Sequence, residues 1–416
     1  MRFEPMLCVL LVCLATDAAA QDGSKQDPAL QDVAQEDEQD AEAVSDAHHL
    51  APTLTRAQLL EVGRQALADG FAFLVATQNA DGSWGSHDPQ IANLENFGFQ
   101  LRNRGSQDAV RLACTAICAT ALMHKADRSQ AEDECLAKAI QALLGTEKFA
   151  YHLGESFNTW GYGYKLDFLT RYLATPEGRA RRAEIEPAAD VCIQGLIRYQ
   201  QADGGWNYYA GPTGGARSMS FNTGDFTRAL LRAESLDLKV STGLAGDAVK
   251  LLRRMRTVRG GFVYDARFLT APQSVNELSA GSRTMACALA LHDAGAFTEA
   301  ELVRSLEIFD EGENYLEDGR KLIQPHTAVH QISGYFYFYG YNYATELAVR
   351  LGDAVPERRW DRFAWTMIRT QEPEGCWWDT AAADYGDKWG TGFALRVLQR
   401  YFEHVDRSSA KAGGER

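Results

Sequence analysis

The sequence has no run of eighteen apolar residues, so no segment is long enough to span a bilayer as a permanent helix. It also has no basic excess, because 42 Lys and Arg stand against 56 Asp and Glu, for a formal net charge of -14. Proteins bind nucleic acid mainly through Lys and Arg, so this balance argues against such a partner. Eight cysteines in 416 residues do not form an obligatory disulfide framework. Hydrophobic residues, at 45 %, are ample for a buried core.

The first twenty residues have the pattern of a secretory signal peptide. Met6 to Ala15 is an apolar run of ten residues, preceded by Arg2 and followed by Ala18-Ala19-Ala20. A short apolar run before small residues is typical of a cleavage site, here before Gln21. The sequence therefore predicts an exported chain, periplasmic or extracellular. Removal of this leader would take two cysteines with it, and no particular bridge among the other six is indicated.

Residues 21–55 form an acidic segment with nine Asp or Glu against one Lys. Its few hydrophobic anchors cannot offset the entropy lost on folding, so we expect a disordered linker. We expect a single folded domain over residues 56–404 and a disordered tail over 405–416.

The folded region repeats a short motif. Gln-x-x-x-Gly-x-Trp occurs at 78–84, 200–206 and 371–377, and a degenerate copy at 256–262 has Arg and Phe in place of Gln and Trp. The copies follow amphipathic runs such as 57–76 and 188–199. Gly tolerates the backbone conformation of a helix end, Gln can bond backbone groups left open there, and Trp offers a flat surface that holds the turn against a neighbouring helix. Each copy therefore predicts a helix, a tight turn and a second helix, with structural roles for Gln and Trp.

The spacing of the copies predicts six helical hairpins. This number requires two weaker turn markers, Tyr151 and Tyr315, whose segments lack the Gln. In each hairpin we place the first helix outside and the second inside. A ring of six hairpins can close on itself and so hide both end faces. The predicted fold class is all-α, an α6/α6 toroid.

The Gln-x-x-x-Gly-x-Trp copies resemble the QW repeats of the prenyltransferase and squalene-cyclase (squalene oxidase repeat) superfamily. The block from Gly375 to Gln399 is similar to secreted bacterial members of that group. The resemblance covers residues 56–404 and implies a terpenoid-cyclase-like toroid. It is less specific for activity, since the superfamily includes cyclases, protein prenyltransferase subunits and thioester domains.

The catalytic motifs that the resemblance implies are missing. The cyclase branch protonates its substrate with Asp-x-Asp-Asp, which does not occur, and the clusters at 310–313 and 384–387 have the wrong spacing. The thioester motif Cys-Gly-Glu-Gln is also absent. Hopene-type cyclisation is therefore not expected, and whether the protein is an enzyme at all stays open.

The zinc site of the prenyltransferase branch is not expected either. Asp133-Glu134-Cys135 and Asp190-Val191-Cys192 match its short pattern, but both fall on predicted outer helices. The segment that should supply the zinc-binding His begins Lys388-Trp389. His326 and His330 are four apart, without a third ligand at a diagnostic spacing. We predict no metal and no cofactor.

The predicted inner helices begin near positions 108, 160, 222, 281, 339 and 389, and several of these starts carry Gly. In a toroid the starts converge on one end, where unpaired N–H groups and aromatic rings can surround a pocket. The run Tyr335–Tyr343 is aromatic on both faces, and ordinary packing explains it equally well. Charged residues near the starts could orient a ligand or pair with one another. The candidate cavity residues are Trp160, Tyr162, Tyr164, Asn222, Asp225, Arg283, Tyr339, Tyr341, Tyr343, Lys388 and Trp389.

Three functions stay open. The first is a protein that binds an apolar or amphipathic ligand in the toroid cavity without turnover. The second is an enzyme of isoprenoid-type chemistry, which needs an acid in a dry cavity. The third is a carbohydrate-active enzyme, which needs paired carboxylates. The expected partner is accordingly a lipid-like or saccharide small molecule, with no nucleic acid.

Overall fold

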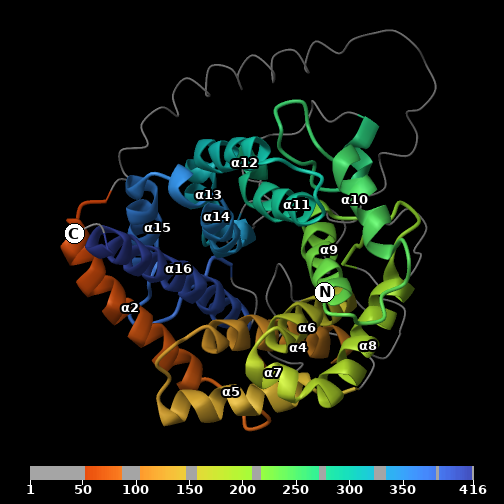
Figure 1. The fold of residues 1–416 in the computed structure, drawn as a ribbon, viewed down its shortest axis with the longest axis horizontal. Helices are drawn as coiled ribbons and strands as arrows, with labels where there is room; N and C mark the ends of the chain where they lie inside the picture. The colour runs from red at the N-terminus through yellow and green to blue at the C-terminus, as the bar shows by residue number, and fades with distance from the viewer. Residues whose placement is uncertain are drawn as a thin grey trace, which may run out of the picture. The chain divides into compact units, whose positions relative to one another are not determined.

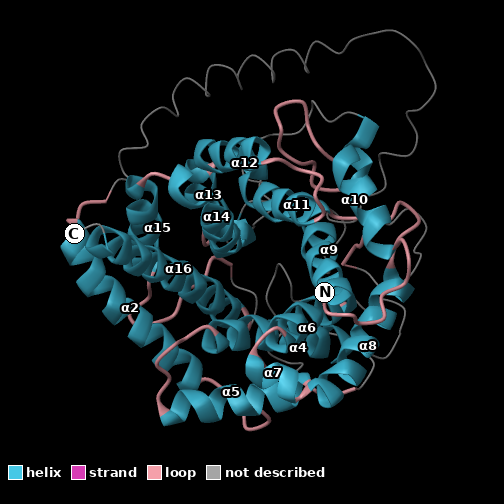
Figure 2. Cartoon of the chain, in the orientation of Figure 1, coloured by secondary structure: helices cyan, strands magenta, loops and turns pink. Residues whose placement is uncertain are grey.

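The computed structural model describes residues 52–86, 104–146, 157–208, 217–270, 278–322, 334–380 and 384–414. The described residues form α-helices and short 3-10 turns, together with two isolated β-bridges and no strand (Figure 2). The predicted signal peptide and nearly all of the predicted linker lie outside the described residues. The folded body belongs to one compact unit, Leu50–Arg416.

The helices form two concentric layers (Figure 1). The inner layer consists of α4 (Arg104–Met123), α6 (Asn158–Leu173), α9 (Ser220–Ser235), α11 (Gly281–Asp293), α14 (Tyr337–Leu351) and α16 (Gly386–Gly414). The outer layer consists of α2 (Arg56–Ala76), α5 (Gln130–Leu143), α8 (Arg182–Tyr199), α10 (Leu244–Arg254), α12 (Glu299–Glu311) and α15 (Glu357–Thr370). Two short helices, α7 (Pro176–Ala180) and α13 (Glu313–Gly319), lie between them in the chain. Outer and inner helices alternate along the sequence, as predicted.

The ring is closed. Each inner helix packs against the next in chain order, and the last, α16, packs against the first, α4. In the outer layer α15 reaches α2 in the same way. The α6/α6 toroid predicted from the repeat is therefore the observed fold.

Sequence and burial explain why each layer is helical. Three outer helices begin with capping boxes, at Thr55, Ser129 and Thr298, in which a side-chain oxygen accepts from the third backbone N–H. The inner helix α11 is buried from Gly281 through Leu291 without interruption, because it touches both the outer layer and its inner neighbours. An inner helix therefore has no polar face to solvent, and small residues such as Gly and Ala allow the close approach.

The motif tryptophans make the same contacts at each strict copy. The indole N–H of Trp84, Trp206 and Trp377 donates at 2.8 Å to the carbonyl ten residues earlier, near the end of the preceding outer helix. The backbone N–H of each of these tryptophans donates to a threonine hydroxyl on the following inner helix at 3.0–3.3 Å. All three side chains are fully buried. The Trp thus joins the two helices of its own hairpin.

The motif glutamines join neighbouring hairpins. The amide of Gln78 donates to Gly82 O at 3.1 Å and to Cys135 O, on the next outer helix, at 2.8 Å. Gln200 and Gln371 make the equivalent pair of bonds. The Gln therefore bonds the turn and the adjacent hairpin, whereas the sequence suggested the open end of its own helix. The motif Gly has φ +86 to +105° in all four copies, a region that L side chains rarely adopt.

Two predictions about boundaries need correction. Tyr315 lies within α13 and is not a turn residue, because the fifth hairpin lacks the motif and the chain resumes a helix at Glu313. The predicted tail beyond residue 404 continues α16 as far as Gly414. Val405 still packs against the core, and His404 Nε2 lies 3.0 Å from Glu357 Oε1, so the helix has tertiary support past that point. Tyr151 lies outside the described residues.

Candidate functional site

An aromatic chamber lies inside the ring, near the starts of four inner helices. Eight of its ten lining residues are aromatic, and its cavity volume is about 40 Å³. This lining suits a small apolar group. We call the following residues the aromatic chamber: Ala113, Ile117, Trp160, Tyr164, Phe221, Tyr335, Phe336, Tyr339, Trp389 and Phe393.

Edge-to-face packing fixes the rings of this chamber. The rings of Trp160 and Trp389 lie 6.2 Å apart at 79°, and those of Tyr339 and Phe393 lie 5.9 Å apart at 90°. The indole N–H of Trp160 donates to Asn222 Oδ1 at 2.8 Å. The chamber is thus built from rings contributed by separate inner helices and held in defined orientations.

Asp225 of α9 is a buried carboxyl group enclosed by tyrosine hydroxyls. Tyr164 Oη donates to Asp225 Oδ2 at 2.9 Å, Tyr339 Oη lies 3.2 Å from both carboxyl oxygens, and Tyr343 also bonds to it. Burial raises the pKa of Asp225 to about 7, although the hydroxyls of Tyr343 and Tyr164 favour its charged form. Asp225 itself lines neither cavity, because the tyrosines stand between it and the empty space.

A second cavity adjoins the first, deeper along the inner helices. Its cavity volume is about 30 Å³, and its lining is largely charged or polar. Ile117, Tyr164 and Phe393 line both cavities, so the two share a wall. We call the following residues the polar chamber: Ala116, Ile117, Thr120, Tyr164, Asp167, Arg171, Asn342, Tyr343, Glu346, Gly392, Phe393, Arg396 and Arg400.

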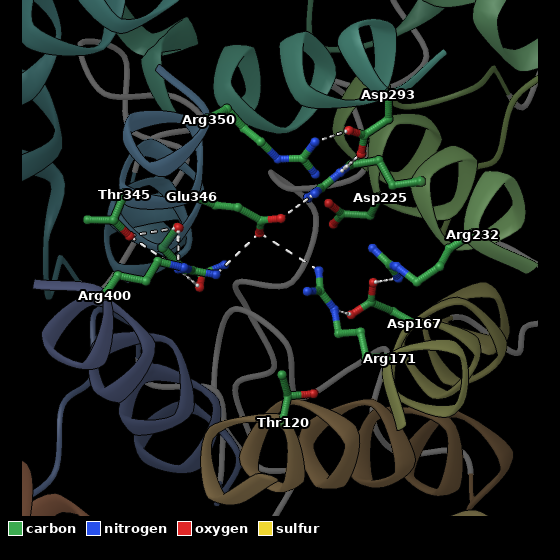
Figure 3. A network of polar contacts seen from close by, with 12 residues as sticks. Thr120, Asp167, Arg171, Asp225, Arg232, Asp293, Thr345, Glu346, Arg350 and Arg400 are labelled. Carbon is green, nitrogen blue, oxygen red and sulfur yellow. Dashed lines mark hydrogen bonds and ion pairs between the residues drawn. The ribbon is translucent and has the colours of Figure 1, made fainter. Parts of the chain in front are cut away.

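Glu346 of α14 is the centre of the polar network (Figure 3). Its carboxylate accepts from Arg228 and, at 3.2 Å, from Arg400 Nη2, and it lies 3.8 Å from Arg171 Nη2. Burial alone would raise the pKa of Glu346, but the three guanidinium groups hold it well below its usual range. Its neighbours come from α6, α9 and α16, so one carboxylate links four inner helices.

Asp167 of α6 is the other carboxylate in this lining. It accepts from Arg171 Nε and from Arg232 Nη1, each at 2.8 Å. Burial opposes its ionisation, yet these two arginines lower the pKa of Asp167 to about 2. Both carboxylates of the polar chamber therefore stay ionised at neutral pH.

The structure brings seven of the eleven candidate residues together. Trp160, Tyr164, Tyr339 and Trp389 line the aromatic chamber, and Tyr343 lines the polar one. Asn222 and Asp225 lie directly behind this wall, bonded to lining residues.

Two candidate tyrosines point to the outer layer instead. Tyr162 stacks on Tyr199 of α8 with ring centres 6.1 Å apart. Tyr341 donates to Glu313 Oε1 at 2.9 Å, beside α12. Both stand two positions from a cavity residue, which turns them to the opposite side of their helix.

Two candidate cations also lie outside the chambers. Arg283 donates to Phe262 O at 2.7 Å and to Ser279 O at 2.8 Å, so it supports the degenerate turn at 256–262. Lys388 pairs with Asp384 at 2.6 Å and with Asp387 at 2.8 Å. The sequence left two roles open for these charged residues, to orient a ligand or to pair with one another. Lys388 pairs with its neighbours.

The sequence did not identify the arginines of the polar chamber. Their signal is a spacing of four that recurs on three inner helices: Asp167 with Arg171, Arg228 with Arg232, and Arg396 with Arg400. Residues four apart share a helix face. Three such pairs at similar depth would have indicated a charged centre, but each pair alone looks like an ordinary solvent-exposed face.

Among the described residues, no group of three or more His, Cys, Asp or Glu could hold a metal ion. The two Asp-x-Cys segments lie on α5 and α8, in the outer layer. His326 and His330 lie outside the described residues. No described helix is both long and apolar enough to cross a membrane.

Comparison with solved structures identifies the class of fold. A variant of the type II terpene cyclase MstE from Scytonema, in complex with geranylgeranyl dihydroxybenzoate, matches with a TM-score of 0.51 and 14% identity, over 84% of this chain and 100% of that chain. An unsaturated glucuronyl hydrolase from Bacillus sp. GL1 matches with a TM-score of 0.53 and 14% identity, over 81% and 96%. No protein-family model and no curated protein matches the chain. The protein therefore has a terpenoid-cyclase-like α/α-toroid fold.

Proposed function

We propose that this protein binds an amphipathic small molecule inside the ring, with the apolar part in the aromatic chamber and the polar group in the polar chamber. The observation that carries the proposal is that an aromatic and a charged cavity adjoin. Ile117, Tyr164 and Phe393 line both of them. A purely apolar ligand would leave the second cavity unused. A purely polar one would not benefit from the desolvation of eight aromatic rings.

The carboxylates weigh against the carbohydrate alternative. Glycoside hydrolysis needs two carboxyl groups that reach the sugar, one of which keeps its proton near neutral pH, and Asp225 lines neither chamber. Asp167 and Glu346 are the carboxylates of the polar chamber, and arginines hold the pKa of both low. These two side chains therefore suit charge pairing and not proton donation.

Native mass spectrometry of the protein after incubation with a total lipid extract tests the proposal. Ala113→Phe places a ring in the aromatic chamber without removing a hydrogen bond. We expect this variant to retain at least tenfold less lipid than the unmodified protein. Ala131→Phe adds the same bulk at an exposed position of α5 and serves as the matched control. Retention of no lipid by the unmodified protein, or equal retention by all three proteins, would contradict the proposal.

Acid chemistry on an isoprenoid is the second candidate, and Asp225 favours it. This carboxyl group is buried, its pKa is raised to about 7, and the hydroxyls bonded to it belong to residues that line both chambers. Both tyrosines donate to Asp225 in the structure, so the step requires Tyr164 or Tyr339 to turn, accept the Asp225 proton and give its own hydroxyl proton to a bound alkene. Incubation with a polyprenyl substrate should then give cyclised or hydrated product, and Asp225→Asn should abolish it without loss of ligand binding.

Family membership and export belong to the same proposal. The three strict motif copies make equivalent Trp and Gln bonds, which supports their assignment as QW repeats of the prenyltransferase and squalene-cyclase group. We propose export on the apolar run and the Ala18-Ala19-Ala20 site. Intact mass and amino-terminal sequencing of protein from a secreting host should show a chain that begins at Gln21. A product that retains Met1 would contradict this.

A further inference from the structure

Positive charge exceeds negative charge at the centre of the ring. The network in and around the polar chamber has five buried or half-buried arginines, Arg171, Arg228, Arg232, Arg396 and Arg400, the exposed Arg350, and three carboxylates, Asp167, Asp293 and Glu346. Asp225 lies beside this network with a pKa near 7, and Glu403 is an exposed carboxylate at its edge. Burial of like charges is costly unless an anion offsets it.

The three carboxylates of the network are already paired with arginines. Asp293 accepts from Arg228 Nε at 3.0 Å and lies 3.0 Å from Arg350 Nη1. Each of the three carboxylates thus serves two or more guanidinium groups. Arg400 completes its bonds with Asn342 O and Oδ1, at 2.8 and 2.9 Å. These neutral acceptors take up its Nη1, while its Nη2 pairs with Glu346, a carboxylate that it shares with Arg228 and Arg171.

Arg396 differs from the other five arginines, because it makes no ion pair with a carboxylate among the described residues. It lines the polar chamber and is 7% exposed, and its Nη1 donates to Gln399 Oε1 at 2.7 Å. Its Nε is buried with no hydrogen-bond partner among the described residues. Burial and the neighbouring Arg400 guanidinium lower the pKa of Arg396, which is the response of a cation in a positive environment. Because the side chain lines the chamber, an acceptor that enters there can bond to its guanidinium group.

We propose that the polar chamber binds the anionic head group of the amphipathic ligand, and that this group is a carboxylate held chiefly by Arg396. This inference rests on the proposed function, since the apolar part of the same ligand fills the aromatic chamber. The lining itself has three arginines against two carboxylates, so one negative charge balances it. A planar guanidinium fits a carboxylate through two parallel N–H bonds.

Three probes that share one alkyl chain test the sign of the head group: dodecanoic acid, dodecan-1-ol and dodecylamine. We expect the acid to bind at least tenfold more tightly than the alcohol at pH 7.5, and the amine to bind most weakly. Titration followed by the fluorescence of Trp160 and Trp389 reports occupancy of the aromatic chamber. Raising the salt concentration should weaken the binding of the acid only.

Arg396→Gln tests the residue. We expect it to bring the Kd of the acid within threefold of that of the alcohol and to leave the alcohol unchanged. Arg254→Gln, at an exposed position of α10, is the matched control and should change neither Kd. Arg396→Lys keeps the charge and should retain part of the preference for acid. If Arg396 only supports the fold, both variants lose alcohol binding and thermal stability together, which would overturn the assignment.

The outcomes separate this inference from the proposed function. Equal binding of acid and alcohol, or tighter binding of the amine, would overturn the anionic head group and leave the amphipathic cavity standing. Failure of all three probes to bind, with Ala113→Phe also without effect on lipid retention, would overturn both.

Discussion

The side-chain amide of Gln371 donates a 2.9 Å hydrogen bond to the backbone carbonyl of Ala66, 305 positions earlier in the chain. The equivalent bonds of Gln78 and Gln200 connect consecutive hairpins. In the last copy of the motif the next hairpin around the ring is the first one. The same local rule that links neighbours therefore also closes the ring.

Gln371→Ala should destabilise the closure. The variant loses the bonds to Ala66 O and Gly375 O, and partly buried hydrogen bonds contribute about 1 kcal/mol each, so we expect a loss of about 1–2 kcal/mol in the free energy of unfolding. Urea unfolding followed by circular dichroism measures it. Gln194→Ala, at an exposed site on α8, is the control and should change stability by less than about 0.5 kcal/mol. Equal stability of the two variants would show that the closure does not depend on this bond.

Trp206→Phe tests the role of the motif tryptophan. The substitution removes the indole bond to Leu196 O and part of a fully buried ring, and we expect a cost of about 2–4 kcal/mol. Trp365→Phe is a suitable comparison, because its indole nitrogen has no hydrogen-bond partner among the described residues. Differential scanning calorimetry should show the larger fall in Tm for Trp206→Phe. The opposite order would argue against the indole bond as the reason for Trp in the motif.

Asp225 should make stability depend on pH. Burial raises its pKa from 3.8 to about 7, so between these values the folded state retains a proton that the unfolded state releases. The free energy of unfolding then falls as pH rises from about 4 to 7. Asp225→Asn removes this titration, and we expect the variant to gain at least about 1.4 kcal/mol relative to the native protein between pH 5 and pH 8.

The comparison of the two proteins isolates this residue. Glu313 and Asp379 also have pKa values raised to about 7 by burial, and they contribute the same slope to both proteins. Gln194→Ala, at an exposed site, removes no titrating group and should show the same pH dependence as the native protein. If the difference in the free energy of unfolding between Asp225→Asn and the native protein did not change from pH 5 to pH 8, Asp225 would not titrate in this range.

The cysteines should be unreactive in the folded protein. All six described cysteines are free and buried, and burial raises the pKa of Cys192 and Cys376 to about 11 and that of Cys135 to about 12. We expect no reaction with a thiol reagent at pH 8 and full reaction in 6 M guanidinium chloride. Six thiols would then be counted if the leader is removed, and eight if it is retained. A count below six would reveal a bridge.

The fold could be predicted because its signals are local. Every strict motif copy lies within seven consecutive residues, and each predicts its own hairpin without reference to the rest of the chain. The inner helices begin within four residues of the predicted positions, and the largest difference is that between Asp108 and Arg104. The fifth hairpin, which lacks the motif, gave a wrong marker in Tyr315, and the marker of the second, Tyr151, lies outside the described residues.

The site was harder to predict because its residues come from separate helices. The run from Tyr335 to Tyr343 is equally aromatic on both sides of the helix, so the sequence does not show which side faces a cavity. The packing shows that Tyr339 and Tyr343 do. On the other side, Tyr337 bonds to Glu317 and Tyr341 bonds to Glu313. The arginine cluster depends even more on the ring, since Arg171, Arg228 and Arg400 meet only around Glu346 of a fourth helix. No stretch of sequence holds that arrangement.

The contact of α16 with α4, and that of Gln371 with Ala66, also set the order of events during synthesis. A ribosome must translate nearly the whole chain before the first hairpin meets the partner that completes its packing. Until then both flanks of the growing arc expose apolar surface, and such intermediates aggregate readily. A truncated product that ends before residue 371 lacks both α16 and the Gln371 bond, and we expect it to be insoluble.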